Sequence, residues 1–341
     1  MVPHYVYYDV TYILTMVQTG GTVICPRYQG GGRVHLRGMI AGCRPISEGD
    51  ALATPLAGRI CAAVTFDGHD LRSRQVDDVL DTAEAALGVR LLRSARTFGT
   101  SGATVGMPTA SDTWVRLAWR PIDRMHEQSW VGAEHASTIS GVRKPALYRS
   151  HRWQDEAREV VWRADEMERV RSAAVHPSGV IDTEPSLPLE WWDNLAGSFD
   201  ALAKHATDRV GMRQEHLTRR INQVFDGQVD TTIDEWTIAN ADAHWGNLTA
   251  PECYLLDWED WGKAPRGLDV ATLWGHSLLV PAVAERIQGR FAADLDTRSG
   301  HLAQLVFCSN VIRLNAKRPD PSPLLEPARA EAERLLRSLR R

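Results

Sequence analysis

The stretch that decides the fold runs from residue 240 to residue 269 and reads NADAHWGNLTAPECYLLDWEDWGKAPRGLD. Asp242 and Asn247 lie five positions apart in it, and Asp257 follows ten positions later, directly after an apolar run at 253–256. The run predicts a short buried strand, which places Asp257 at its C-terminal end. Carboxylate and carbonyl oxygens are the ligands that a hard cation such as Mg2+ prefers, so these three residues are candidates for such a site.

Three stretches carry a family resemblance: NADAHWGN at 240–247, LDWE at 256–259 and APRGLDVA at 264–271. They resemble the aminoglycoside phosphotransferases and their small-molecule kinase relatives. In that family a loop close to His-Gly-Asp-x-His-x-x-Asn precedes an apolar strand, Asp-Trp/Phe-Glu and Gly-Pro-Arg-x-x-Asp-Leu-Ala. This chain departs from the pattern at Asn240 and Ala241, where His and Gly are usual. Those positions shape the loop rather than perform the chemistry.

The resemblance implies an α+β, bilobal, protein-kinase-like fold with a small β-rich N-lobe and a larger, mostly helical C-lobe. It implies an ATP- or GTP-dependent phosphotransferase that transfers the γ-phosphoryl group to a hydroxyl of a small molecule. In these roles Asp242 is the catalytic base that orients and deprotonates the hydroxyl. Asn247 and Asp257 hold Mg2+ against the phosphates.

Chance is the alternative for the spacing alone, because an isolated Asp or Asn often caps a helix or closes a turn. The combination with Asp257, Glu259 and the Pro-Arg-Gly-Leu-Asp tail favours the catalytic interpretation. Asp269, at the end of that tail, is expected to begin or brace a helix, where the macrodipole favours an acid.

Composition is that of a globular protein of 341 residues with a formal net charge of -4, which argues against a general nucleic-acid binder. The five cysteines are scattered and form no Cys-x-x-Cys pair, so a reducing, cytoplasmic location is expected. No stretch of about 20 apolar residues predicts a membrane span, and residues 5–17 do not read as a signal peptide. The oligomeric state cannot be read from the sequence.

Three regions are predicted. Residues 1–70 form an unassigned N-terminal extension, which is a small β appendage, a poorly ordered segment or the product of a start site set too far upstream. Residues 71–170 are the nucleotide-binding N-lobe. Residues 171–341 are the helical C-lobe, with the catalytic loop and the acceptor site.

The N-lobe is predicted to begin with a helix at 74–87, followed by a hairpin whose strands start at 91–92 and span 112–119. In the family, the loop at this turn covers the nucleotide phosphates. Gly99, Ser101 and Gly102 are the corresponding candidates, because small residues let backbone amides approach anionic oxygens. An ordinary hairpin loop is the alternative.

In the strand at 113–119, Arg116 is expected on the face opposite Val115 and Leu117, since side chains alternate. The family places a Lys here to hold the nucleotide phosphates, and Arg116 stands in its place as a permanent cation with a fork of donors. A solvent-facing edge-strand Arg is the alternative. The family braces this cation with a helix Glu; Glu134, in a predicted helix at 130–140, is the candidate, with Glu127 as the alternative.

The C-lobe is predicted to be helical. Its first helix, after Pro188, has Trp191 and Trp192 on an apolar stripe that is expected to pack in the core rather than bind a ligand. The last N-lobe strand and the connector are expected between 158 and 170. The further helices are predicted at 217–225, 270–279, 281–291, 299–314 and 324–339.

Two other functional classes stay open. One is a non-catalytic nucleotide- or metabolite-binding protein with the same fold, suggested by Arg116 and Asn240. The other is a metal-dependent hydrolase with an acidic cluster, whose residues are Asp242, His244, Asp257 and Glu259. In the phosphotransferase interpretation His244 packs the loop, and Glu259 points toward the site as a supporting acid. The identity of the acceptor cannot be read from the sequence.

Overall fold

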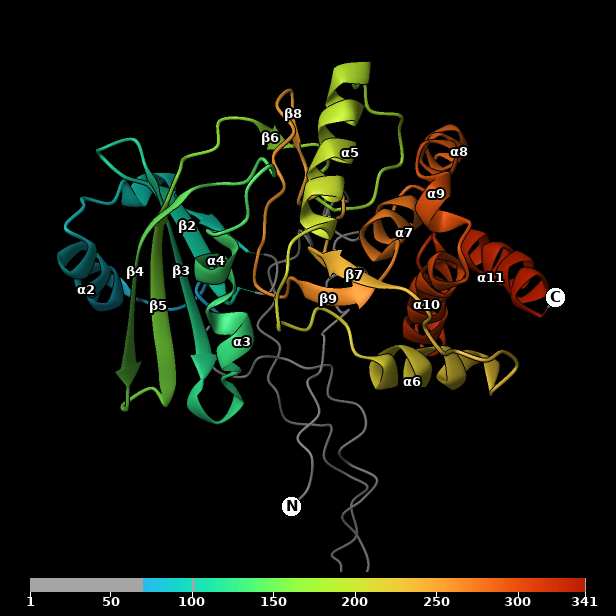
Figure 1. Ribbon diagram of the computed structural model, residues 1–341. Coiled ribbons are helices and arrows are strands. Elements are labelled where there is room, and N and C mark those ends of the chain that lie inside the picture. Colours follow the sequence, from blue (N-terminus) through green and yellow to red (C-terminus); the bar gives the residue numbers. More distant parts are fainter. Residues whose placement is uncertain (1–69, 100–101, 341) are drawn as a thin grey trace, which may run out of the picture.

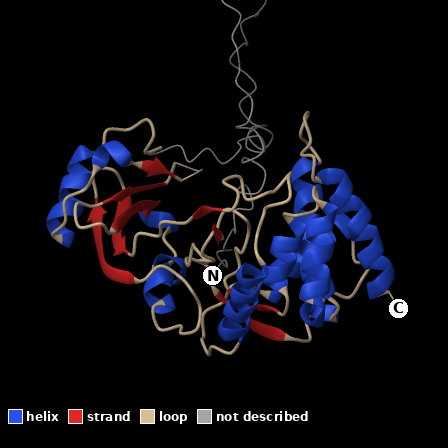
Figure 2. Cartoon of the chain, turned by 90° about the horizontal axis from the view of Figure 1, so that it is seen from above, coloured by secondary structure: helices blue, strands red, loops and turns tan. Residues whose placement is uncertain are grey.

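The computed structural model describes residues 70–99 and 102–340. In Figure 1 these residues form two parts, one built around a β-sheet and the other mainly of helices. The view from above in Figure 2 shows the same division. The expected α+β, bilobal architecture is confirmed. Residues 1–69, nearly all of the predicted extension, lie outside the described residues, and the lobe limits near 70 and 170 stay predictions.

Helix α2 (Asp77–Leu87) opens the described N-lobe. It ends at Gly88, whose φ of +65° suits glycine, and the Gly88 N–H donates to the Glu84 carbonyl. The helix packs its apolar face on β4 and β5. The predicted helix is thus confirmed and begins three residues later than expected. Its buried side chains are Val79, Leu80, Ala83 and Leu87.

The sheet of the N-lobe is antiparallel throughout, with strand order β1-β2-β3-β5-β4. In Figure 1, α2 lies on its outer side, and α3 (Glu127–Trp130) and α4 (Gly132–Ala136) lie between the sheet and the helical lobe. The five strands are β1 (Thr97–Phe98), β2 (Thr104–Pro108), β3 (Trp114–Pro121), β4 (Leu147–Asp155) and β5 (Val160–Met167).

Strand β3 alternates as the sequence predicts. Val115 and Leu117 are fully buried in the N-lobe core. Arg116 lies on the opposite face, in register with Gly106 of β2 and Asp165 of β5. Arg116 is therefore on a central strand and not on a solvent-facing edge.

The predicted strand at 91–92 is wrong. Leu91 makes only an isolated bridge to Thr109, and a 3-10 turn, η2 (Arg93–Ala95), follows it. The side chain of Arg93 folds back onto α2, where it forms ion pairs with Asp81 and Glu84. These ion pairs hold the chain in a turn at the position where the pattern predicted an extended strand.

The predicted helix at 130–140 is split into α3 and α4 around Val131. The first residue of α4 is Gly132. A side chain does not fit at this position, because a Cβ would collide with the carbonyl oxygens of Trp258 and Glu259. The short helices therefore lie directly against the segment that follows Asp257. This close approach links the N-lobe to the most informative stretch of the sequence.

Strand β4 was not predicted from the sequence. It is the sheet's edge strand beside β5, and most of its side chains are exposed or half-buried. Its residues, LYRSHRWQD, are therefore largely polar and lack the apolar run that marks a buried strand.

The C-lobe contains the helices that the sequence predicts, with α9 as a short addition, and its centre is the long buried helix α10. Among the described residues no helix is long and apolar enough to cross a membrane. The helices are α5 (Leu189–Ala203), α6 (Gln214–Phe225), α7 (Leu268–Gly275), α8 (Pro281–Arg290), α9 (Ala292–Leu295), α10 (Arg298–Asn315) and α11 (Leu325–Leu339).

Two small ladders frame the stretch at 240–269. Strand β6 (Ala173–Ala174) pairs with β8 (Thr249–Ala250), and β7 (Trp236–Ala239) pairs with β9 (Gly262–Pro265). The strand predicted at 253–256 is wrong, because only Leu255 bridges, to Leu248. The run is apolar because Cys253 and Leu255 are buried in the C-lobe core, not because it belongs to a sheet.

Three tryptophans join α5 to the loop between β7 and β8. Trp245 of that loop stacks on Trp191 with ring centroids 6.1 Å apart, and it meets Trp192 edge-on at 6.0 Å. The Trp245 indole N–H also donates to the Ser277 Oγ at 2.9 Å. Trp191 and Trp192 are thus core residues, as expected.

Replacing the fully buried Trp245 with Ala should lower the free energy of unfolding by about 3–5 kcal/mol, because it leaves a large cavity and removes the hydrogen bond to the Ser277 Oγ. Urea denaturation measures the change. Tyr148→Ala, at a side chain that is 53% exposed, is the control and should change stability by less than about 0.5 kcal/mol. Equal effects of the two substitutions contradict the packing described.

Candidate active site

The loop between β7 and β8 carries Asp242 and Asn247. Hydrogen bonds to the side chain of Asp269 fix the backbone of this loop. The Asp269 carboxylate accepts hydrogen bonds from the backbone N–H groups of Asn240 and Ala241, each at 2.8 Å. Ala241 has a φ of +70°, in the left-handed region that favours glycine. This explains why Gly is usual at that position. The loop geometry survives with Ala because Asp269 holds it.

Asn240 connects the loop to the segment that contains Asp257. Its Nδ2 donates to the backbone carbonyl of Asp257 at 2.8 Å, and its Oδ1 accepts from the Asp242 N–H at 3.2 Å. The side chain is fully buried between the two segments. Asn240 therefore fixes the relative position of the two aspartates, a role that the sequence did not reveal.

Asp242 and Asn247 are in direct contact. The Asn247 Nδ2 donates to the Asp242 Oδ2 at 2.9 Å and to its backbone carbonyl at 3.0 Å. The side chain of Asp242 is 47% exposed, so it remains open to an incoming group. Loss of hydration in the cleft, with repulsion from Asp257 and Asp260, raises the pKa of Asp242 well above its ordinary value.

Asp257 is exposed and has a φ of +52°. Loss of hydration and the negative charge of Glu259 raise its pKa, while Arg116 opposes that shift. The negative charge of Asp260 thus disfavours the charged form of both Asp242 and Asp257. A bound cation would relieve this repulsion.

Arg116 reaches across from β3 to the segment after Asp257. Its Nη2 pairs with one carboxylate oxygen of Glu259, and the Nη2 of Arg120 pairs with the other at 3.0 Å. Both arginine side chains are 27% exposed and Glu259 is 22% exposed. The two arginines lower the pKa of Glu259 to about 2, although burial alone would raise it. Glu259 is therefore an ionised bridge between the lobes.

The predicted pairing of Arg116 with Glu134 is wrong. Glu134 of α4 pairs with Arg163 of β5 at 3.3 Å. Arg163 is also held by Asp165, whose carboxylate oxygens lie 2.7 and 2.9 Å from its Nε. The alternative candidate, Glu127, pairs with Arg152 at 2.7 Å. The acid that pairs with Arg116 is instead Glu259, 143 positions further along the chain. Local spacing could not indicate so distant a partner.

Arg209 supports the Glu259 segment from behind. Its guanidinium donates to the backbone carbonyls of Gln128, Glu259 and Trp261, at 2.6, 2.7 and 3.0 Å. The Gln128 side chain in turn donates to the Val210 carbonyl at 2.8 Å. One buried arginine thus fastens α3 of the N-lobe to the segment that carries Glu259, and sequence analysis did not identify it.

A cavity of about 550 Å³ lies between the lobes beside these residues. Arg116, Asn247, Asp257 and Glu259 all line it. The other lining residues are Trp114, Ala133, Ala136, Ser137, Lys144, Pro145, Ala146, Leu147, Asp165, Met167, Glu168, Val170, Ser172, Leu256 and Trp258.

The turn between β1 and β2 contains Gly99 and Gly102. The Gly99 N–H donates to the Thr104 carbonyl at 2.9 Å, and the Gly102 N–H donates to the Gly99 carbonyl at 3.0 Å. Gly102 has a φ of +72°, which requires glycine. Ser101, the third residue predicted to contact phosphate, lies outside the described residues. The phosphate-binding role of this turn stays a prediction.

His244 is buried beneath the loop. Its Nδ1 accepts from the Gly246 N–H at 3.0 Å, and burial lowers its pKa to about 3, so it is neutral at physiological pH. It lies against Gly179, where a Cβ would come within 2.9 Å of its Nδ1. These contacts are those of a loop-packing residue.

The residues of the hydrolase alternative do not form a ready metal cluster. Within residues 70–99 and 102–340, no group of three or more His, Cys, Asp or Glu side chains is placed to hold a metal ion. An Asn and an Asp at the cavity suit a different kind of site, in which Mg2+ keeps waters and substrate phosphates in its shell.

Comparison with solved structures identifies the fold. No protein-family model and no curated protein matches the sequence. The structure is similar to amicoumacin kinase in complex with AMP-PNP, Ca2+ and Ami: the TM-score is 0.52 at 11% identity, over 79% of this chain and 96% of that one. It is also similar to a thermostable mutant of aminoglycoside phosphotransferase APH(4)-Ia in its apo form, with a TM-score of 0.50 at 9% identity, over 76% and 98%. These similarities confirm the kinase-like fold that the resemblance implied.

The buried Asp269 provides a test of the loop's electrostatics. Burial raises its pKa to about 6 from 3.8, despite the two N–H groups that favour its charge. A raised carboxylate pKa means that the native state holds the proton more tightly. Stability from this residue is thus greatest at low pH and falls as pH rises through 3.8 to about 6. Relative to Asp269→Asn, the wild type should lose about 2–3 kcal/mol between about pH 4 and pH 7.

Urea denaturation of both proteins across that pH range measures the difference, and Asp320→Asn, at an exposed position, is the control that should show no such trend. If the stability of the wild type relative to Asp269→Asn instead rises with pH, the two backbone N–H groups outweigh burial and the prediction is wrong.

Proposed function

We propose that this protein is a phosphotransferase that moves the γ-phosphoryl group of ATP or GTP to a hydroxyl group of a small molecule. One observation carries the proposal. The Asp242 carboxylate is 47% exposed and hydrogen-bonded to Asn247, which lines the cavity between the lobes, while Asn240 fixes that loop to Asp257. The similarity to an amicoumacin kinase solved with AMP-PNP and Ca2+ supports the use of a nucleotide and a divalent cation.

Asp242 is the proposed base. It orients the acceptor hydroxyl and receives its proton as the oxygen attacks the γ-phosphorus and the bond to the β-phosphate oxygen breaks. The raised pKa of Asp242 makes it a better proton acceptor than an ordinary carboxylate. Asn247 holds the Asp242 carboxylate in place through its Nδ2.

Asn247 and Asp257 are the proposed ligands of Mg2+. The side-chain hydrogen bonds of Asn247 within the described residues all use Nδ2, so its Oδ1 can face a cation. Asp257 is exposed, so a cation can reach it. The charge of Glu259 disfavours ionisation of Asp257, and a bound cation would favour it. When bound, Mg2+ supplies charge neutralisation for the phosphates. Two protein ligands are enough for this metal.

Arg116 is the proposed anchor for the nucleotide phosphates. Glu259 engages one of its terminal nitrogens, and a guanidinium has five N–H donors, so donors remain for phosphate oxygens. The turn at Gly99 and Gly102 is proposed to cover the phosphates. Positioning and charge neutralisation are most of what phosphoryl transfer needs from a protein.

Calorimetry should show magnesium-dependent binding of ATP or GTP in the micromolar range. Asp257→Ala should weaken it at least about tenfold, because a carboxylate that faces the cation and its phosphates is lost. Asp320→Ala, at an exposed residue in the turn before α11, is the matched control and should bind as the wild type does. Folded protein that binds neither nucleotide would refute the proposed function.

Asp242→Asn separates binding from transfer. It should bind the nucleotide within about twofold of wild type, since the residue is assigned to the hydroxyl, yet lose at least about a hundredfold in transfer rate. The assay incubates the protein with a nucleotide labelled in its γ-phosphate and a panel of small-molecule alcohols, and it measures the label transferred to each alcohol. Nucleotide binding by the wild type without transfer to any acceptor would favour the non-catalytic binding protein.

Glu259→Gln tests which acid braces the anchor. Removing its charge takes away the carboxylate that Arg116 and Arg120 share, and nucleotide affinity should fall about tenfold because Arg116 is held less firmly toward the cavity. Glu134→Gln is the matched control and should change affinity by less than about twofold, since Glu134 pairs with Arg163. Tighter binding by Glu259→Gln would instead show that Glu259 competes with the phosphates.

A further inference from the structure

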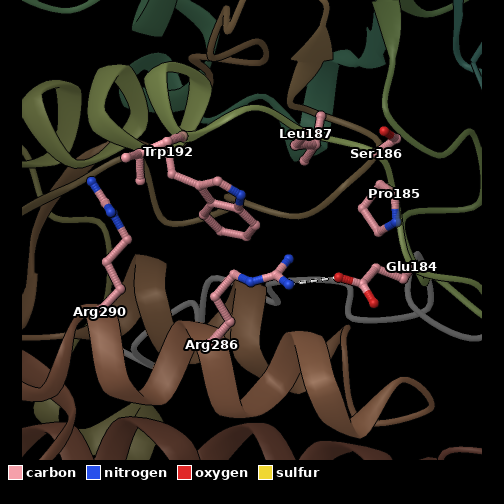
Figure 3. Close-up of a pocket in the computed structure, with 8 residues that line it drawn as sticks. Glu184, Pro185, Ser186, Leu187, Trp192, Arg286 and Arg290 are labelled. Carbon is pink, nitrogen blue, oxygen red and sulfur yellow. Dashed lines mark hydrogen bonds and ion pairs between the residues drawn. The ribbon is translucent and has the colours of Figure 1, made fainter.

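A second cavity, of about 720 Å³, lies in the C-lobe between α8 and the start of α5. Figure 3 shows α8 along one side, with the segment before α5 and the first turns of α5 on the other. This cavity shares no lining residue with the one between the lobes. Its lining residues are Glu184, Pro185, Ser186, Leu187, Leu189, Trp192, Arg286 and Arg290.

The polar side of the cavity is cationic. Arg286 and Arg290 come from successive turns of α8, and Glu184 is the one acid among the lining residues. Arg286 pairs with Glu184 at 2.6 Å, and its guanidinium lies 5.9 Å from the centre of the Trp192 ring. Arg290 pairs with Asp193, which does not line the cavity. Two arginines and one carboxylate therefore line the cavity, and one of the two arginines has its acid partner outside the lining.

Two N–H groups of the lining residues make no hydrogen bond within the described part of the chain. The Nε of Arg290 is buried and makes no hydrogen bond within the described residues. The indole N–H of Trp192 also makes none there, and in Figure 3 its nitrogen is turned toward the side where Pro185 and Leu187 lie. The Arg290 Nε is shielded from the cavity, whereas the indole N–H of Trp192 is available to an acceptor oxygen of a ligand.

The opposite side is apolar. Pro185, Leu187 and Leu189 line it, and Leu189 is 70% exposed, which is unusual for a leucine in this chain. An apolar surface facing arginines suits a ligand that has an apolar body and one charged end.

We propose that this cavity binds a small molecule with an oxyanion, a carboxylate or a phosphate, attached to an apolar body. Arg286 and Arg290 take the oxyanion, because guanidinium groups bind such anions with paired donors. The indole N–H of Trp192 adds a third donor, and the apolar body contacts Pro185, Leu187 and Leu189. The proposal is independent of the phosphotransferase assignment.

The side chain of Trp192 separates the cavity from the loop that carries Asp242. Trp192 lines the cavity on one side and meets Trp245 of the loop edge-on, with ring centroids 6.0 Å apart. The two aromatic residues thus give a physical contact between the cavity and the segment that carries Asp242. The binding experiment below does not depend on that contact.

Saturation-transfer NMR on the full chain tests the site with three probes of similar size: benzoate, neutral benzamide and cationic benzylamine. Benzoate should bind best, and its affinity should fall as NaCl is raised from about 50 to 500 mM, because screening weakens the ion pairs. Phenyl phosphate, compared with benzoate, distinguishes a phosphate from a carboxylate as the preferred end. Equal binding of all three benzene derivatives, or no binding of either anion, overturns the proposal.

Substitutions locate the site. Arg286→Gln and Arg290→Gln should each weaken benzoate binding about three- to tenfold, and Glu184→Gln should strengthen it about threefold, because it removes the competing acid beside Arg286. Arg329→Gln, which removes an arginine paired with Glu326 on α11, is the matched control and should have no effect. Glu184→Gln keeps the test decisive if an arginine variant folds poorly. Unchanged affinity in all three cavity variants overturns the proposal.

The indole N–H gives a direct readout. In a 15N spectrum, the indole signal absent from Trp192→Phe identifies Trp192, and benzoate should shift that signal in the wild type. A shift confined to other tryptophans would place the probe elsewhere and overturn the proposal.

Discussion

The carboxylate of Glu259 is the constraint on which the arrangement of the two lobes depends. It lies in the segment after Asp257 and accepts hydrogen bonds from Arg116 and Arg120 of β3. These arginines lie 143 and 139 positions earlier in the chain. A guanidinium does not lose its proton in a protein, so each partly buried arginine must keep an acceptor. Breaking such a pair by removing the shared acid would leave two uncompensated cations between the lobes.

Backbone contacts make that pairing possible. Gly132 admits the carbonyl groups of Trp258 and Glu259 against the start of α4, where any side chain would collide with them. Arg209 also donates to the carbonyl groups of Glu259 and Trp261. The segment is thus held through its backbone as well as through the Glu259 carboxylate. A loop so held can present Asp257 to the cavity in a left-handed conformation that an aspartate would rarely adopt freely.

Sequence reasoning succeeded where the information is local. The spacing of Asp242 and Asn247 predicted two residues that the structure places in contact, and the alternation in β3 placed Arg116 on the face opposite the core. It failed where partners are distant. The brace for Arg116 was sought at Glu134, eighteen positions away, and lies at Glu259. No local pattern reports an ion pair between segments that meet only after folding.

Other misses have different physical causes. Strand β4 is an edge strand with a polar sequence, so the burial that makes a strand recognisable was lacking. Asp269 looked like an ordinary acid at a helix start, and it does lie in the first turn of α7. Its carboxylate, however, holds the backbone N–H groups of Asn240 and Ala241, and a contact to backbone leaves no trace in the identity of the contacted residue.

The arginine at position 116 and the acid at position 259 explain each other. A lysine has three donors on a single nitrogen, whereas an arginine spreads five donors over three nitrogens. A guanidinium has separate donors on a rigid fork, so one nitrogen can bind Glu259 while others stay available. Because Glu259 lies two residues beyond Asp257, the same short segment carries the acid that holds Arg116, the proposed phosphate anchor, and Asp257, a proposed cation ligand. The ion pair with Glu259 therefore keeps the guanidinium of Arg116, which belongs to the other lobe, next to the segment that carries Asp257.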